Sequence, residues 1–199
     1  IWLFPIICIS GRANERPEML SLLFLGLWLW IATHTDRQPA WIRYLPLIQL
    51  VWVNCHALFV LGLFVGLCYG IDAVVRHFAR GHLFLEPRSS GPSLRAVAIV
   101  GGLVGVACFV NPYFEQGALF PMVLYRKFSI EKEFYSKNIG EFRSPIDHMM
   151  RFGLTNVYLI SEVAVWFIAA FSFLWLLSAK RKISPFRLML FAGFSHLAW

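Results

Sequence analysis

Long apolar blocks separated by short polar connectors set the pattern of the chain. The blocks cover approximately residues 1–10, 17–32, 42–78, 94–111, 154–179 and 186–199. A helix needs about 17 to 25 mostly apolar residues to cross the hydrocarbon core of a bilayer, whereas a soluble domain breaks its apolar residues into shorter stretches. The pattern therefore predicts an all-α fold, a polytopic transmembrane helix bundle that forms a single domain.

The block at residues 42–78 is about twice as long as one crossing requires. Pro46 removes a backbone donor, and Asn54 and His56 are able to satisfy backbone groups at a break. We therefore expect the helix to break within residues 51–57. Two layouts fit: a re-entrant helix that turns at Asn54 and continues as the spanning helix, or two short crossings.

The charges of the connectors predict the orientation in a membrane. Residues 76–95 and 180–187 are rich in arginine and lysine, whereas residues 112–153 mix basic and acidic side chains. By the positive-inside rule the basic connectors are cytoplasmic, and residues 112–153 form one long external loop whose first part is amphipathic enough to lie along the membrane surface. The same rule favours the re-entrant layout with one net crossing within 42–78, which puts residues 33–40 outside.

The composition narrows the class of protein further. The chain of 199 residues is 58% hydrophobic and 15% charged, so we expect membrane lipid around it. The net charge of +7 lies in the connectors, where orientation explains it, and we expect no nucleic-acid partner. The chain starts and stops within apolar blocks, which indicates an internal fragment of a longer protein.

Neither the cysteines nor any known catalytic motif in the sequence indicates a cofactor. Each cysteine stands alone within an apolar stretch, without a C-x-x-C pair or a histidine at zinc-ligand spacing. The sequence contains no nucleotide-binding loop, nucleophile elbow or kinase motif. We therefore expect neither a metal site nor a cofactor.

In two predicted helices glycine recurs every fourth residue, at Gly62, Gly66 and Gly70 and again at Gly101 and Gly105. Residues four apart lie on one face of a helix, and small residues let another helix approach closely. We expect the two glycine faces to pack together or onto the same neighbour.

Asp72 and Arg76 stand one helical turn apart at the end of the second apolar half of residues 42–78. This spacing predicts an i,i+4 ion pair that closes the helix. Such a pair is worth only a few tenths of a kcal/mol.

The polar pair Asn54 and His56 is the first candidate site, since it stands between Trp52 and Phe59 in an apolar block. Lipid offers such groups no hydrogen-bond partner. One hypothesis is that the pair binds a polar head group or phosphate at the membrane boundary. The structural alternative is that both side chains cap a broken helix through bonds to backbone groups.

Two further candidate sites carry acids. Glu162 shares a predicted helical face with Thr155 and Tyr158, and an acid within a span usually faces a polar cavity, so we expect an intramembrane polar site. The other candidate lies in the external loop and gathers Glu141, Arg143, Asp147 and His148. A solvated loop surface is the structural alternative for that cluster.

Three short motifs follow one another along the chain: W-V-N-C-H-A-L-F-V-L-G at residues 52–62, N-P-Y at residues 111–113 and E-F-R-S-P at residues 141–145. They resemble the W-x-N-x-H-G-G-F-x-x-G, N-P-Y-G and E-W-x-S-P motifs of bacterial multi-spanning proteins related to the GT-C superfamily. These are lipid-linked sugar transferases akin to protein O-mannosyltransferases. The chain departs from the motifs at Ala57, Leu58, Phe114 and Phe142.

The resemblance implies part of a glycosyltransferase-like protein of the bacterial inner (plasma) membrane, which transfers a sugar from a polyprenyl-phosphate donor at the outer membrane face. It implies that Asn54, His56 and Glu141 contact the substrate or the lipid phosphate. In that superfamily the catalytic acid lies in the first external loop, upstream of residue 1 of this chain. We therefore assign no catalytic residue.

Two other classes of function remain open. In a transporter or channel-like protein, Glu162 and His56 would line a polar pathway. In a non-catalytic membrane scaffold, none of the three polar sites would matter. An acid or acid pair in the first external loop would favour the transferase.

Overall fold

The computed structural model describes residues 18–78, 91–131, 133–135, 149–150, 153, 156–179 and 183–198. Within these residues all the regular elements are helices, which confirms the predicted all-α class. The expected span at residues 1–10 lies outside the described residues.

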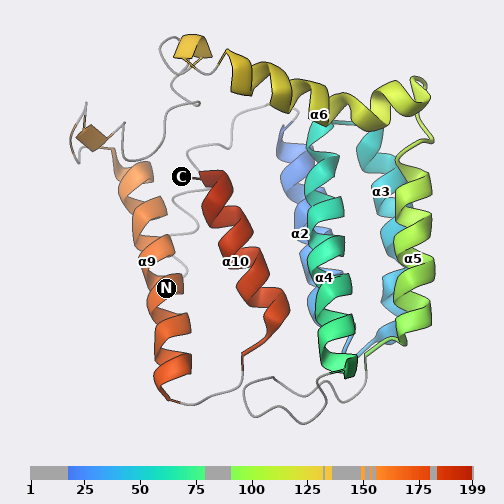
Figure 1. Cartoon of the computed structure of the whole chain (residues 1–199), viewed down its shortest axis with the longest axis horizontal. Coiled ribbons are helices and arrows are strands. Elements are labelled where there is room, and N and C mark those ends of the chain that lie inside the picture. The colour runs from blue at the N-terminus through green and yellow to red at the C-terminus, as the bar shows by residue number, and fades with distance from the viewer. Residues whose placement is uncertain are drawn as a thin grey trace.

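The helices before residue 110 form an antiparallel bundle (Figure 1). α2 (Glu18–His34) is followed by the 3-10 helix η1 (Pro39–Tyr44), which continues directly into α3 (Leu45–Val53). A short 3-10 turn, η2, then leads into α4 (Val60–Phe78).

α5 (Leu94–Ala107) completes the bundle and packs on both α3 and α4. It begins at Ser93, whose hydroxyl accepts a hydrogen bond from the backbone N–H of Ala96 at 3.2 Å. This is the usual N-cap arrangement, in which a side-chain oxygen satisfies an otherwise free N–H of the first turn.

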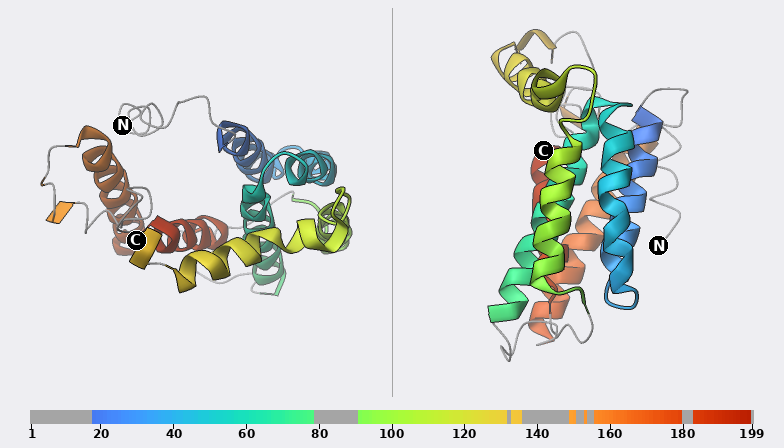
Figure 2. Two further views of the ribbon diagram at one scale, coloured as in Figure 1. Left: turned by 90° about the horizontal axis from the view of Figure 1, so that it is seen from above. Right: turned by 90° about the vertical axis from the view of Figure 1, so that its right-hand side faces the viewer.

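α6 (Phe114–Ile130) lies across one end of the bundle, nearly perpendicular to α4 and α5 (Figures 1 and 2). None of its residues is buried, and many of its large apolar side chains are exposed. The helix therefore falls within the segment predicted to lie along a membrane surface.

α9 (Val157–Ser178) and α10 (Pro185–Ala198) form a second antiparallel pair. Trp166 in α9 donates a hydrogen bond from Nε1 to Ser195 Oγ in α10 at 2.8 Å. α10 in turn packs on α4 and so joins the pair to the bundle (Figure 2).

The helix break predicted within residues 51–57 is confirmed, because α3 ends at Val53 and η2 begins at Ala57. The re-entrant layout itself stays a prediction. η1 and α3 together run antiparallel to α4 along the bundle, so residues 33–40 lie at the same end as the C-terminus of α4 (Figure 1). The two-crossing alternative matches this arrangement.

The 3-10 geometry of η1 lengthens this segment. A 3-10 helix rises about 2.0 Å per residue against 1.5 Å in an α-helix, so η1 and α3 together reach about 25 Å. At one end of this segment Asn54 Nδ2 donates to Val110 O just beyond α5, at 2.9 Å. At the other end Ile42 and Leu45 line a cavity together with Val97 near the start of α5.

The glycines of α4 do not pack on those of α5, contrary to expectation. Gly62 and Gly66 instead contact the indole of Trp28 in α2, which is almost completely buried. A Cβ built on Gly101 or Gly105 would meet no atom within 4 Å. The two glycine faces instead line one apolar cavity of about 680 Å³ between α4 and α5.

Two helical segments are long and apolar enough to cross a membrane, Ala57–Phe78 and Val157–Ser178. They differ in how far the rest of the protein covers them. Within α9 the buried residues are Leu159 and Ser161 alone, although the helix is apolar on all sides. α2 and α5 are apolar as well but shorter.

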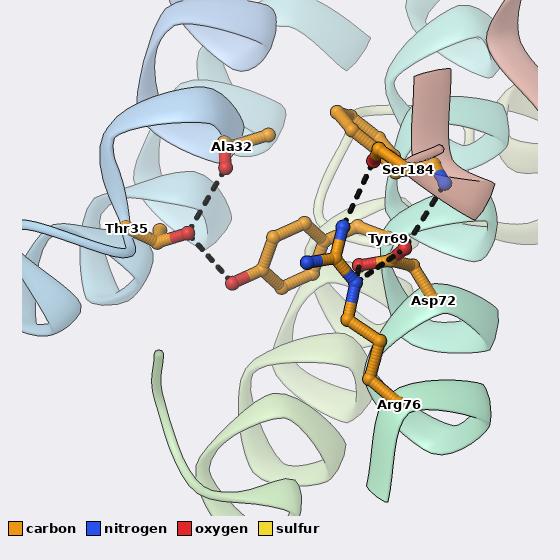
Figure 3. A network of polar contacts seen from close by, with 7 residues as sticks. Ala32, Thr35, Tyr69, Asp72, Arg76 and Ser184 are labelled. Carbon is orange, nitrogen blue, oxygen red and sulfur yellow. Dashed lines mark hydrogen bonds and ion pairs between the residues drawn. The ribbon is translucent and has the colours of Figure 1, made fainter. Parts of the chain in front are cut away.

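A buried polar network joins α4 to the start of α10 (Figure 3). Asp72 and Arg76 form the predicted ion pair, with Arg76 Nε 2.9 Å from Asp72 Oδ2. Asp72 Oδ1 also accepts from the backbone N–H of Phe186 at 3.0 Å, and Arg76 Nη2 donates to Ser184 Oγ at 2.8 Å. The predicted ion pair is therefore confirmed, and it is largely buried and also caps the start of a second helix.

The same region holds a second polar contact between α2 and α4. Thr35 Oγ1 donates to Ala32 O at 2.9 Å and lies 2.7 Å from the hydroxyl of Tyr69 (Figure 3). The Tyr69 ring also meets Phe186 edge-on, with 5.8 Å between the ring centroids. Both polar contacts lie toward the end of the bundle opposite α6.

Candidate functional site

The turn between α3 and η2 lies at the α6 end of the bundle, where η2 contacts α6. The N–H groups of Cys55 and His56 both donate to Trp52 O, at 2.9 and 3.1 Å, and so close the end of α3. His56 then takes an extended conformation, with φ −161° and ψ 145°, which ends the helical path. The chain reverses here because the polar residues Asn54 and His56 satisfy backbone groups at the break.

The His56 ring is held by two donors at Nδ1. The backbone N–H of Leu58 donates to it at 3.3 Å, and Ser21 Oγ of α2 lies 3.0 Å away. Ser21 Oγ in turn accepts from Nε1 of Trp52 at 3.0 Å. Ser21 and Trp52 are both buried, whereas His56 is half-buried.

The other ring nitrogen of His56 is accessible. Nε2 has no hydrogen-bond partner among the described residues. It is also not one of the buried unpaired polar atoms in that part of the chain, which are Trp28 Nε1 and Gln49 Oε1. His56 thus offers one free nitrogen at the surface of the α6 end.

Asn54 has a structural role. Its Nδ2 donates to Leu50 O at 2.8 Å and to Val110 O at 2.9 Å, which ties the end of α3 to the end of α5. An amide carries two hydrogens, so both are used by backbone carbonyls. The geometry matches the capping alternative for Asn54 and leaves no N–H for the phosphate contact that we expected from it.

Asn111 organises the turn between α5 and α6. Its Nδ2 donates to Cys108 O at 2.9 Å and to Phe114 O at 3.0 Å, while its Oδ1 accepts from the N–H of Tyr113 at 2.8 Å. Phe114 lies in the left-handed region with φ 48°. Gly117 packs directly on the Asn111 side chain, where a Cβ would leave no room for the amide.

Sequence reasoning missed two buried polar residues that support this end of the bundle. Ser21 joins α2 to His56, as described above. Gln49 is fully buried in α3, and its Nε2 donates to Phe59 O at 3.1 Å and to Cys108 Sγ at 3.4 Å. The available signal was the same for both, since each is a single polar residue within an apolar helix.

Tyr158 and Glu162 lie away from His56. Both are exposed, and α9 is separated from the helices that carry His56 by α10 (Figure 2). α9 begins at Val157, so Glu162 lies in its second turn and not in the middle of a span, as we expected. Thr155 lies outside the described residues.

The external cluster at Glu141, Arg143, Asp147 and His148 also lies outside the described residues. The structure therefore places Asn54 and His56 together and leaves Glu141 unplaced. Across the described ranges, no group of three or more His, Cys, Asp or Glu side chains is arranged to hold a metal ion. Comparison with family models, with curated proteins and with solved structures finds no match to this chain.

Proposed function

We propose that the chain is part of a polytopic membrane protein that transfers a sugar from a polyprenyl-phosphate donor at the outer face of a bacterial inner membrane. In this proposal the α6 end of the bundle faces outward, and His56 contacts the phosphate of the donor. The catalytic acid belongs to a segment upstream of this chain.

The exposure of α9 supports a membrane environment. This apolar helix exposes many large side chains, including Phe167, Phe171, Leu174 and Trp175, and its buried residues are Leu159 and Ser161. A soluble protein buries such a helix, because exposed apolar patches of this extent favour association. The exposed apolar side chains of α9 favour contact with the acyl chains of lipid. The amphipathic helix α6 favours the headgroup region of the same membrane.

One observation carries the proposal for the site. The motif at residues 52–62 and the motif at residues 111–113 are far apart in the sequence, yet they meet at the α6 end of the bundle. The bond from Asn54 Nδ2 to Val110 O, at 2.9 Å, ties the first motif to the residue just before the second. Motifs that belong to one substrate site should converge in this way.

The backbone at Phe114 is a second point in favour of the resemblance. In the resembled N-P-Y-G motif this position is glycine, and here it adopts φ 48°. Glycine takes such a conformation without the cost of about 1 to 2 kcal/mol that other residues meet. The shape of this turn is therefore the one that the glycine of the motif would favour.

The chemistry of His56 suits a phosphate at a membrane boundary. In a neutral imidazole whose Nδ1 accepts hydrogen bonds, Nε2 carries the proton and is a donor. A hydrogen bond to a charged phosphate oxygen is stronger than one between neutral groups. The ring supplies this donor without placing a fixed positive charge next to lipid.

The test is sugar transfer by the full-length protein carrying His56→Ala. We expect transfer to fall roughly ten- to hundredfold, the loss of one hydrogen bond to a charged group, with normal membrane insertion. His77→Ala is the matched control, since His77 is an exposed histidine at the opposite end of α4. Full activity of His56→Ala would refute the proposal, and loss of transport in Glu162→Gln would favour the transporter instead.

A further inference from the structure

A directional chain of hydrogen bonds ends at His56. An indole N–H can only donate, so Trp52 must donate to Ser21 Oγ in the contact of 3.0 Å. The Ser21 hydroxyl is then free to donate its own hydrogen to His56 Nδ1, 3.0 Å away. The backbone N–H of Leu58 donates to the same nitrogen at 3.3 Å.

These donors leave the neutral ring one tautomer. Nδ1 accepts from two N–H or O–H groups, so the ring hydrogen must be on Nε2. A ring turned over by half a rotation would place the C–H of Cδ2 against both donors and lose both bonds. Trp52 and Ser21 are buried, with 0% and 2% of their surfaces exposed, so water does not compete for the bond between them.

We propose that Ser21 and Trp52 are positioning residues that hold His56 with Nε2–H turned outward as a donor to an anionic phosphate oxygen. The identity of this ligand rests on the function proposed above. The orientation of the ring does not, because it follows from the contacts of Ser21, Trp52 and Leu58. α2 thereby contributes to the site even though it supplies no group that touches the ligand.

The test is nitrogen NMR of the full-length protein, labelled in its histidines and held in lipid nanodiscs. His56 is identified by the signal that disappears in His56→Gln. We expect the wild-type ring to be protonated at Nε2, and we expect Ser21→Ala to shift the Nδ1 resonance because one of its donors is gone. Ser161→Ala is the matched control, since Ser161 is equally buried but lies in α9.

Two results would overturn the positioning role. One is a wild-type His56 that is protonated at Nδ1. This measurement does not depend on whether any variant folds. The other is an Nδ1 resonance that is the same in Ser21→Ala and in the wild type.

The ligand is tested separately by adding polyprenyl phosphate, with phosphatidylglycerol as the anionic-lipid control. We expect polyprenyl phosphate alone to shift the Nε2–H resonance, and Ser21→Ala to bind it roughly fivefold more weakly. If the Nδ1 result holds but polyprenyl phosphate shifts nothing, the positioning role stands and the proposed function fails.

Discussion

At the scale of single residues, the absence of a side chain at Gly62 shapes the centre of the bundle. A Cβ at this position would lie 2.5 Å from Gln49 Oε1 and 3.0 Å from Trp52 Cζ3. Gln49 and Trp52 are fully buried and cannot move away easily. Gln49 also donates a hydrogen bond to the carbonyl of Phe59. A Cβ at Gly62 that displaces Gln49 would therefore disturb the start of α4.

We therefore predict that Gly62→Ala destabilises the protein by about 1 to 3 kcal/mol through overpacking. Gly70→Ala is the matched control, because Gly70 lies two turns further along the same helix and a Cβ there meets nothing within 4 Å. It should stabilise α4 by about 0.5 to 1 kcal/mol, since alanine favours a helix more than glycine. Unfolding in detergent by denaturant measures both changes, and a similar loss in both variants would contradict the argument.

At the scale of the elements, the attachment of α10 depends on Asp72. This carboxylate accepts the N–H of Phe186 in the first turn of α10, where a negative charge also favours the helix dipole. It pairs at the same time with Arg76, which bonds to Ser184. One buried acid thus joins the last turns of α4 to the start of α10.

We predict that Asp72→Ala lowers the free energy of unfolding by about 3 to 5 kcal/mol, because it leaves a buried guanidinium without its carboxylate. Glu131→Ala is the control, as Glu131 is an exposed acid at the end of α6 and should change stability by less than about 0.5 kcal/mol. Thermal unfolding of the purified full-length variants gives the comparison. Equal stability of the two variants would show that the network contributes little.

At the scale of the whole molecule, the antiparallel path of residues 39–78 decides which connectors lie at the same end of the bundle. The start of η1 and the start of α5 both lie at the end opposite α6 (Figure 1). In a membrane-spanning bundle these two regions face the same compartment. In such a bundle α6 faces the other compartment.

We predict that this topology holds in the membrane, and cysteine labelling tests it. The full-length protein in a cysteine-free background carries Arg37→Cys, Arg95→Cys or Gln116→Cys. All three positions are exposed. Positions 37 and 95 should react with a membrane-impermeant reagent from the same side, and position 116 from the opposite side. Labelling of position 37 together with position 116 would restore the re-entrant layout.

The sequence by itself determined the helical class, the approximate extent of most helices and the break at Asn54. These features follow from local rules, since the length of an apolar block and the position of a polar break are visible without any partner. The pair Asp72 and Arg76 was also visible, because residues four apart meet on any helix.

Only the tertiary structure decided the direction of η1 and α3, the partner of the glycines at 62 and 66, and the polar contacts of Ser21 and Asp72. Each depends on side chains from distant parts of the chain, such as Trp28 against α4 or Phe186 against Asp72. Their positions are set by how large and polar groups fit into one shared interior. No local pattern specifies that fit, because packing depends on every neighbour at once.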